Sequence, residues 1–347
     1  MNAIGSKRKR LLQAGAAALA VSLMIAGCSS DEPGGDDGTN LAPGDNNEKG
    51  ETVVIGFSGP AADHGWLGAI NSAAIAQAEA YGDVDLRVAE GTNDANLQIS
   101  QVETFVNEGV DAIVLLPTDG AALTEAAIAA MRAGIPVINV DREFSSTEAA
   151  RVTILGDNYG MGVSAGEYIC NELGGKSDAV VAEIAGIDSL PLTQDRTRGF
   201  NDALAKCGLK VSARVAADFT IAGGQAVTEQ LLSANPKIDA IWNHDDDQGI
   251  GVLAAIDEAG RDEFFMVGGA GSLNAMNAIK AGDTVLVATV IYPSTQAADG
   301  IALARLLAQG KSMADLASSG VPHRIVLDAP VVTKDNVDEY IHLGFKS

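Results

Sequence analysis

The chain has 347 residues, of which 47% are hydrophobic and only 4% are aromatic. That length is enough for two ordinary domains with buried cores, and a core rich in Ala, Val, Ile and Leu is typical of helices packed on parallel strands. The formal net charge of -23 argues against nucleic acid or an anionic membrane as the main partner.

The first 28 residues have the layout of an export signal. A basic run at residues 7–10 precedes an apolar stretch of about seventeen residues, which is slightly short for the alternative, a membrane-spanning anchor. The closing residues Ile25-Ala26-Gly27-Cys28 resemble the bacterial lipoprotein box, in which the cysteine is acylated and becomes the first residue of the mature chain. We therefore expect a lipoprotein held by Cys28 on the outer face of the cytoplasmic membrane.

Residues 29–51 follow this signal and show no apolar periodicity. They are rich in Gly, Asp, Asn and Pro, a composition that cannot bury enough apolar surface to fold. The segment is predicted to be a disordered tether that is extended by its own charge.

From residue 52, short β-branched runs alternate with longer helical patterns, which predicts a doubly wound α/β fold with parallel sheets. Gly109 and Gly134 stand where helix C-terminal caps belong, each just before a strand. The alternation restarts near residues 151–158, so the chain is predicted to form two lobes. Three late segments return the chain between the lobes: a strand at 284–293, a helix at 294–310 and a last strand at 324–332. The N-terminal lobe is assigned residues 52–156 and 293–325, and the C-terminal lobe residues 157–291 and 326–347.

Cys170 and Cys207 each lie at the C-terminal end of a predicted helix. Export would place them in an oxidising compartment, where a disulfide persists. The two helices would run in the same direction and could bring these ends together at one edge. Two buried free thiols are an equally acceptable interpretation.

Ligands of open α/β sheets bind at the carboxyl ends of the strands. The residues that follow the predicted strands are polar and charged, whereas the helices are otherwise rich in alanine. These residues are 58–64, 117–119, 141–142, 186–196, 219, 245–247 and 270–272.

Seven segments, taken in their order and spacing, resemble the type 1 periplasmic sugar-binding proteins, among them the ribose- and galactofuranose-binding proteins. The segments are GFSGPAADHGWLGAI, GVDAIVLLPTD, IPVINVDRE, GDNYGMGVSAGEYI, QDRTRGF, ADFT and NHDDDQGIG. The resemblance covers about residues 52–335. It implies two α/β lobes joined by a three-strand hinge, a monosaccharide or polyol held in the cleft, and delivery of that ligand to the permease subunits of an ABC importer.

The resemblance also assigns ligand contacts by position. Carboxylates accept hydroxyl hydrogens, arginines donate a planar fork, and aromatic faces cover the C–H faces of a sugar. Trp66 and Phe219 could instead be core residues, Arg196 a surface charge at a helix start, and Asp141 simply the end of its strand. The assigned residues are His64, Trp66, Asp141, Arg142, Arg196, Phe219, Asp245 and Tyr292. Asp141 and Arg142 are also expected to pair with each other.

Three departures from the family pattern count against ribose itself. The aspartate usual after FFMVG is replaced by residues 269–272, which read GAGS. The asparagine that ribose-type members place before Pro-Thr-Asp is Leu116 here, and a glutamine of the third hinge strand aligns with Ile291, beside Tyr292. These departures favour another sugar or a smaller polyol.

The run His244-Asp245-Asp246-Asp247 could indicate a metal cluster. Consecutive side chains at the start of a helix point in different directions, however, so the four cannot converge on one metal ion. We predict that Asp245 faces the ligand and that Asp246 or Asp247 caps the helix, because carboxylates favour a helix N-terminus.

The sequence has no HExxH pattern and no complete phosphate-binding GxxxxGK[ST] loop, and its GxSxG match at residues 162–166 falls inside a predicted helix and not at a strand-to-helix turn. A binding protein without cofactor or metal, acting as a monomer and without nucleic acid, is therefore the favoured interpretation, and a sugar-active hydrolase is a weaker one. The alternative output for the same fold is a ligand sensor for a membrane receptor kinase or chemoreceptor.

Overall fold

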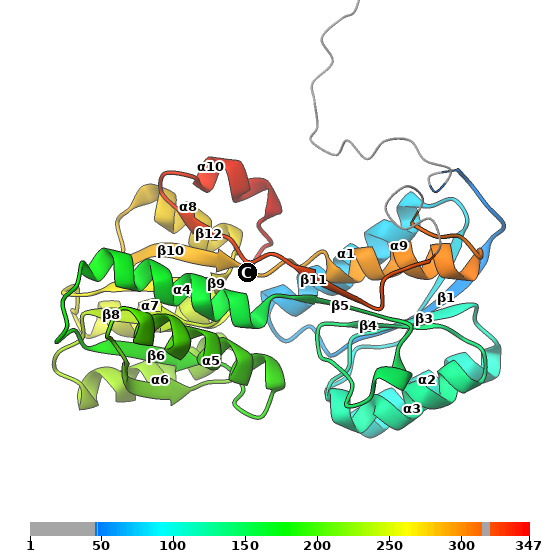
Figure 1. Ribbon diagram of the computed structural model, residues 1–347, viewed down its shortest axis with the longest axis horizontal. Coiled ribbons are helices and arrows are strands. Elements are labelled where there is room, and N and C mark those ends of the chain that lie inside the picture. Colours follow the sequence, from blue (N-terminus) through cyan, green and yellow to red (C-terminus); the bar gives the residue numbers. More distant parts are fainter. Residues whose placement is uncertain (1–45, 47, 314–319) are drawn as a thin grey trace, which may run out of the picture. The chain divides into compact units, whose positions relative to one another are not determined.

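The computed structural model describes residue 46, residues 48–313 and residues 320–347. The predicted signal segment, Cys28 and most of the predicted tether lie outside these residues. The described chain forms two six-stranded sheets with helices on both faces of each (Figure 1). Among the helices of the described residues, none combines the length and the hydropathy needed to cross a bilayer.

The first sheet contains only parallel pairs, in the order β11-β5-β4-β3-β1-β2. Helices α1 and α9 cover one face of this sheet, and α2 and α3 cover the other. Its strands are β1 (Val53–Ser58), β2 (Val84–Val88), β3 (Ala112–Leu115), β4 (Val137–Val140), β5 (Val152–Gly156) and β11 (Arg324–Leu327). Its helices are α1 (Gly65–Ala80), α2 (Ala95–Glu108), α3 (Gly120–Arg132) and α9 (Gln296–Ala308).

The second sheet has the order β12-β10-β9-β8-β6-β7, and its pairs are parallel except β12 against β10. Helices α4 and α5 pack on one face, and α6, α7 and α8 on the other. Its strands are β6 (Val181–Ala185), β7 (Val211–Ala216), β8 (Ala240–Asn243), β9 (Phe265–Ala270), β10 (Leu286–Ile291) and β12 (Val331–Thr333). Its helices are α4 (Asn158–Leu173), α5 (Pro191–Lys206), α6 (Ile221–Ala234), α7 (Asp246–Glu258), α8 (Leu273–Ala281) and the short α10 (Val337–Tyr340).

The sequence signals for these elements are local and strong. Strands β3 and β4 are buried at every position, as expected for parallel strands covered on both faces. Gly109 and Gly134 adopt left-handed backbone angles after α2 and α3, as predicted. The two-lobed doubly wound architecture predicted from the sequence is therefore confirmed.

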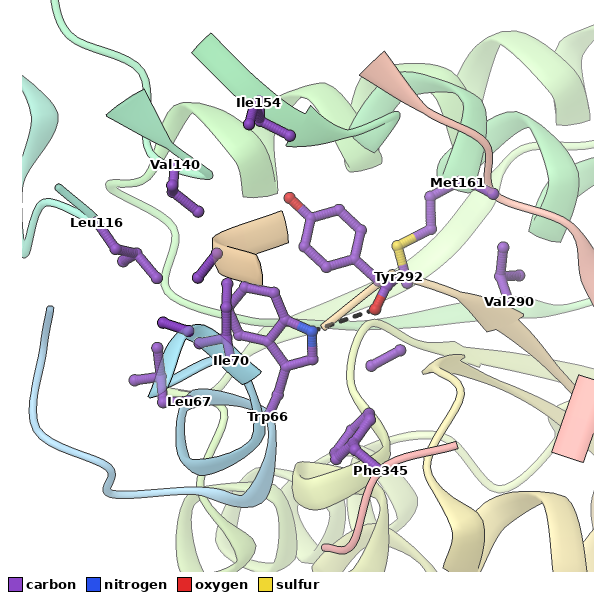
Figure 2. Close-up of a cluster of buried hydrophobic side chains, with 14 of the residues drawn as sticks. Trp66, Leu67, Ile70, Leu116, Val140, Ile154, Met161, Val290, Tyr292 and Phe345 are labelled. Carbon is purple, nitrogen blue, oxygen red and sulfur yellow. Dashed lines mark hydrogen bonds between the residues drawn. The ribbon is translucent and has the colours of Figure 1, made fainter. Parts of the chain in front are cut away.

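One hydrophobic core cluster contains residues of both lobes. Figure 2 shows Trp66, Leu67 and Ile70 of α1 on one side of it and Tyr292, which follows β10, close to Trp66. Met161 of α4 and Phe345 near the end of the chain belong to the same cluster. The packing that stabilises each lobe therefore continues into the other.

The chain passes between the sheets three times, after β5, after β10 and after β11. The boundary predicted between residues 325 and 326 is wrong, because Val326 and Leu327 pair with Leu155 and Gly156 in the first sheet. The single last strand predicted at 324–332 is two strands, interrupted near Pro330. Proline cannot donate a hydrogen bond to a ladder, and the second strand reverses its pairing direction.

Residues 48–51, predicted to belong to a disordered tether, are instead held on the first lobe. Arg305 donates hydrogen bonds to the carbonyl oxygens of Asn46 at 2.6 Å and Glu48 at 2.8 Å. The same guanidinium pairs with buried Asp83 at 2.6 Å, and Asp83 accepts the Gly50 N–H at 2.6 Å. Composition could not indicate this contact, because it uses the backbone of the segment and not its side chains.

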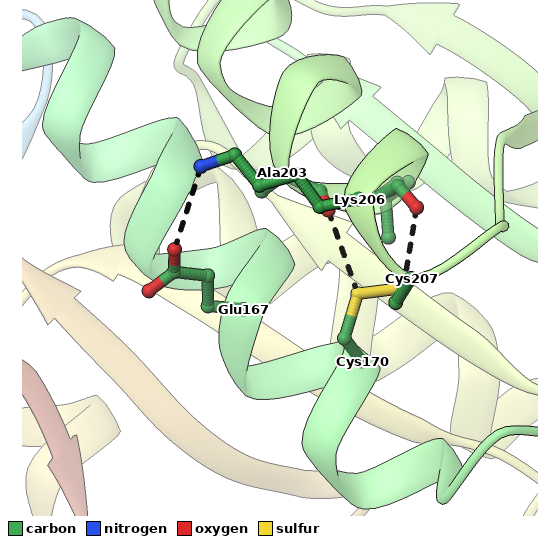
Figure 3. The surroundings of a disulfide bond; sticks show 6 residues. Glu167, Cys170, Ala203, Lys206 and Cys207 are labelled. Carbon is green, nitrogen blue, oxygen red and sulfur yellow. Dashed lines mark hydrogen bonds and ion pairs between the residues drawn. A yellow bond between two sulfur atoms is a disulfide. The ribbon is translucent and has the colours of Figure 1, made fainter.

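Helices α4 and α5 approach each other backbone to backbone. A Cβ on Gly162 would collide with the Arg196 carbonyl oxygen, and a Cβ on Gly199 with the Tyr159 carbonyl oxygen. Cys170 and Cys207 form a disulfide at the far end of this helix pair (Figure 3). The glycines allow the backbones of α4 and α5 to approach closely, and the disulfide joins the C-terminal ends of the two helices.

Reduction of the Cys170–Cys207 disulfide is expected to lower the free energy of unfolding. The bond closes a loop with a sequence separation of 37 residues. Such a loop corresponds to about 3–4 kcal/mol in the chain-entropy description. Urea unfolding of the oxidised protein, compared with the reduced protein and with a Cys170→Ser/Cys207→Ser variant, measures this difference. Alkylation of both cysteines in unreduced, unfolded protein, located by peptide mass spectrometry, would contradict the pairing.

Candidate functional site

All eight residues assigned to ligand contact from the sequence line one small cavity of about 30 Å³. The first lobe contributes His64, Trp66, Asp141 and Arg142, and the second lobe contributes Arg196, Phe219 and Asp245, with Tyr292 at a crossing between them. Leu192 of α5 completes the lining and was not predicted. A wider hollow of about 380 Å³ shares Asp141, Arg142 and Leu192 with this cavity.

Two of the lining residues have unusual backbone conformations. Asp141 (φ 64°) and Phe219 (φ 69°) occupy the left-handed region, which non-glycine residues seldom adopt. A third such residue, Ala270 (φ 86°), ends β9. Backbone strain of this kind persists where the surrounding structure over-determines it, and it clusters at functional sites.

Asp141 follows β4 and is buried. Tyr292 donates its hydroxyl hydrogen to Asp141 Oδ1, whereas the nearest approach of Arg142 Nε to this carboxylate is 3.9 Å. Burial raises the pKa of Asp141, and the Arg142 charge and the Tyr292 hydrogen bond oppose that rise. The ion pair expected between Arg142 and Asp141 is present, and Tyr292 is the closer partner of the carboxylate.

Arg142 Nη1 donates to the Thr118 carbonyl oxygen at 2.8 Å. Its Nε is buried and has no hydrogen-bond partner among the described residues. The backbone contact fixes the guanidinium at the carboxyl end of the first sheet. Its Nε lies 3.9 Å from Asp141 Oδ2, so the guanidinium charge is beside that carboxylate.

Arg196 is 3% exposed and is therefore not a surface charge. Its Nε donates to Asn158 Oδ1 at 2.9 Å, and its Nη1 donates to the His244 carbonyl oxygen at 3.2 Å. Its guanidinium carbon lies 4.5 Å from the centroid of the Tyr292 ring, within the range of a cation–π contact. The close α4–α5 approach described above places Arg196 within reach of Asn158.

Asn158 connects this arginine to the tyrosine. Its amide donates to the Tyr292 hydroxyl oxygen at 3.0 Å while its carbonyl oxygen accepts from Arg196. Burial raises the pKa of Tyr292, and the adjacent Asp141 charge adds to that rise, so the phenol keeps its proton. Asn158 was not predicted as a site residue, although its place at the start of α4, two positions after the end of β5, is a signal that could have identified it.

Trp66 is both a core residue and a cavity residue, so the two interpretations of it are compatible. It is 5% exposed, belongs to the core cluster and lines the cavity. Its indole N–H donates to the Tyr292 carbonyl oxygen at 3.1 Å, and the two rings lie 5.4 Å apart (Figure 2). The indole thereby attaches the start of α1 to the chain that crosses between the lobes.

Phe219 is likewise buried and lines the cavity. Gln248 of α7 holds its backbone, because Gln248 Oε1 accepts the Phe219 N–H at 3.1 Å. Gln248 Nε2 in turn donates to Asn243 Oδ1 at 2.7 Å. Gln248 is another residue that the sequence analysis missed, and its contact partner lies 29 positions away.

The aspartate run has a different division of roles from the one predicted. Asp245, not Asp246 or Asp247, caps α7, accepting the N–H groups of Asp247 at 2.9 Å and Gln248 at 3.1 Å. Asp245 also lines the cavity, so the same residue both caps α7 and belongs to the predicted ligand site. Burial raises the pKa of Asp245, and the neighbouring Asp247 charge adds to that rise.

Asp246 holds the loop that follows β9. Its carboxylate accepts three backbone N–H groups, from Gly269 at 3.0 Å, Gly271 at 2.9 Å and Ser272 at 2.8 Å. The Thr289 hydroxyl is a fourth donor at 2.9 Å. Burial raises the pKa of Asp246 to about 7, against the effect of these donors. This carboxylate binds the loop at which family members usually place a ligand aspartate.

His244 is fully buried, and its ring contacts Glu183 and Trp242. Its Nε2 lies 2.9 Å from Glu183 Oε1, and the centroid of its ring lies 4.1 Å from that of Trp242, with the two planes tilted by 40°. Burial lowers the pKa of His244, which the Glu183 hydrogen bond opposes. Within the described part of the chain, no three His, Cys, Asp or Glu side chains are grouped to hold a metal ion. His244 contributes to the site through its carbonyl oxygen, which holds Arg196.

The comparisons with known proteins agree with this geometry. Residues 55–312 match the model of the periplasmic binding protein domain family. The chain therefore belongs to the periplasmic binding proteins, a family of solute-binding proteins.

Two relatives and one solved structure illustrate the similarity. The ribose import binding protein of Bacillus subtilis is 35% identical over 62% of this chain and 70% of its own length. The xylitol-binding protein of Mycolicibacterium smegmatis is 30% identical over 74% of this chain and 70% of its own length. A crystal structure of a protein from Mycobacterium smegmatis, in complex with β-D-fucofuranose, superposes with a TM-score of 0.75 at 26% identity, covering 83% of this chain and 94% of that one.

Asp246→Ala is expected to lower the free energy of unfolding by about 3 kcal/mol, because four buried donors lose their acceptor. Asp262→Ala, at an exposed position of the same lobe, is the matched control and should change the free energy of unfolding little. Urea denaturation measures both. Equal stability of the two variants would contradict the role given to Asp246.

Proposed function

We propose that this chain is an extracytoplasmic binding protein that captures a monosaccharide or polyol between its lobes and delivers it to an ABC importer. The observation that carries the proposal is the cavity lined from both lobes by two carboxylates, two arginines and three aromatic rings. The names of the relatives, a ribose import binding protein and a xylitol-binding protein, support a polyhydroxylated ligand.

The charges of the cavity favour a neutral ligand. The two carboxylates of Asp141 and Asp245 balance the two guanidinium groups of Arg142 and Arg196. A charged ligand would therefore leave the cavity with a net charge. Hydroxyl groups can both donate to the carboxylates and accept from the guanidinium groups, which leaves buried charges satisfied. The rings of Trp66 and Phe219 supply the apolar surface that a sugar or polyol backbone needs.

Tyr292 bears on the size of the ligand. It lines the cavity beside Asp141, and its hydroxyl uses one carboxylate oxygen of that residue. The loop at residues 269–272 gives its N–H groups at 269, 271 and 272 to Asp246, so these donors are not directed to a ligand. Both features reduce the number of ligand hydroxyls that the protein can satisfy, and they favour a small polyol over ribose.

Capture would proceed by closure of the lobes around the ligand. The three crossings between the sheets are the only covalent connections between the lobes within the described residues, and they can act as a hinge. A ligand that contacts both lobes binds the closed arrangement better than the open one and so increases its population. The importer would then recognise the closed form, and no chemical step on the ligand is needed.

The envelope location is part of the same proposal. The basic and apolar segment that ends at Cys28 supports export and acylation of that cysteine. We propose that the protein is a monomer attached to the membrane only through this lipid.

Metabolic labelling with a palmitate analogue should mark the wild-type protein and not Cys28→Ala. Labelling of both would contradict acylation at Cys28.

Isothermal titration with xylitol, glycerol, myo-inositol and ribose tests the ligand class. At least one polyol should bind, and Arg196→Ala should weaken that binding about 100-fold, because a buried charge contact to the ligand is lost. Lys206→Ala is the matched control, since Lys206 lies at the other end of the same helix, is exposed and pairs with Glu167 at 3.8 Å. Absence of heat with a broad sugar and polyol panel, or wild-type affinity in Arg196→Ala, would count against the proposal.

A further inference from the structure

Asp247 makes a hydrogen bond that crosses from the second lobe to the first. It lies in the first turn of α7 in the second lobe and is 2% exposed. Its Oδ2 accepts the backbone N–H of Trp66, in the first turn of α1 in the first lobe, at 2.8 Å. The two residues are 181 positions apart in the sequence.

Helix α1 has no cap of its own. His64 occupies its N-cap position without a side-chain hydrogen bond to the helix, and the first turn contains no acidic residue. The first N–H groups of a helix need acceptors, and an anion beside them is stabilised by the helix dipole. Asp247 supplies that acceptor from the opposite lobe. Helix α7 is meanwhile capped by Asp245, so Asp247 is not needed for that purpose.

Gly65 leaves the space that this contact needs. A Cβ on Gly65 would lie 2.6 Å from Asp247 Oδ1, 2.6 Å from Ser347 Cα and 2.7 Å from the Lys346 carbonyl oxygen. Residue 345, next to these, is attached to the second lobe, because the Phe345 carbonyl oxygen accepts the Leu273 N–H at 2.7 Å. The start of α1 therefore fits against two separate segments of the second lobe.

We propose that Asp247 is a positioning residue for ligand capture, which favours the closed arrangement of the lobes by capping α1 across the cleft. The inference rests on the proposed function. When the lobes separate, the Trp66 N–H and the Asp247 carboxylate must part, and α1 loses its cap. Closure is therefore favoured by a contact outside the ligand, next to Trp66, which lines the cavity.

Two variants remove the contact in different ways. Asp247→Ala removes the acceptor, and Gly65→Ala keeps the acceptor but inserts a methyl group into the closed interface. Gly68→Ala is the matched control for the second, since a Cβ there meets only Ala62 Cβ at 4.0 Å. Asp94→Ala is the control for the first, because Asp94 caps α2 within a single lobe.

The first measurement needs no ligand. Hydrogen exchange should show protection of the Trp66 amide in the wild type, Gly68→Ala and Asp94→Ala, and protection lowered about fivefold or more in Asp247→Ala and Gly65→Ala. Small-angle scattering should give a larger radius of gyration for the same two variants. Wild-type protection in both variants would overturn the proposal. If Asp247→Ala does not fold, the result for Gly65→Ala alone tests the proposal, because that variant keeps every polar group.

The second measurement uses xylitol as the probe. Asp247→Ala and Gly65→Ala should release it about tenfold faster than the wild type and the two controls. Lowered amide protection with an unchanged release rate would reduce Asp247 to a structural cap and overturn the proposal. If xylitol does not bind the wild type, the choice of ligand fails, and the ligand-free exchange and scattering results still decide whether Asp247 favours closure.

Discussion

The candidate site depends on one constraint, the buried charge of Arg196. A guanidinium cannot be neutralised in a protein, so its burial requires acceptors that are already in place. Asn158 and the carbonyl oxygen of His244 supply them, and the faces of Tyr292 and Phe219 cover the ion. Those acceptors are held by α4 and by the end of β8, whose positions follow from glycine packing and from the sheet. The geometry of the cavity is thus a consequence of how the second lobe is packed.

Much of the fold could be predicted because its signals are local. Continuous apolar strands, helical periodicity and the left-handed glycines after α2 and α3 are each visible within a few residues. The errors arose where contacts between residues far apart in the sequence determine the structure. The break between β11 and β12 depends on two different partner strands, β5 and β10, and Glu48 is held by Arg305, more than 250 positions later.

The lining of the site was predictable because the family resemblance assigned its residues by position, and most of them follow strands whose carboxyl ends meet at one edge of a sheet. The roles within the lining were not. Whether Asp245, Asp246 or Asp247 caps α7 depends on the backbone at Asp245, on the loop after β9 and on the start of α1, which lies in the other lobe. Three adjacent carboxylates therefore have three unrelated sets of partners. The run of three aspartates in the sequence does not indicate which partners each of them has.

The contact between Arg305 and the carbonyl oxygens of Asn46 and Glu48 has a mechanical consequence. If Cys28 attaches the protein to a membrane, any tension along the leading segment reaches the folded body at these bonds and at Asp83, which pairs with the same arginine. Arg305 lies on α9 in the first lobe, so the load would enter that lobe alone. The tether is thus attached on one side of the crossings only, so its tension is not applied between two points on opposite sides of the cleft.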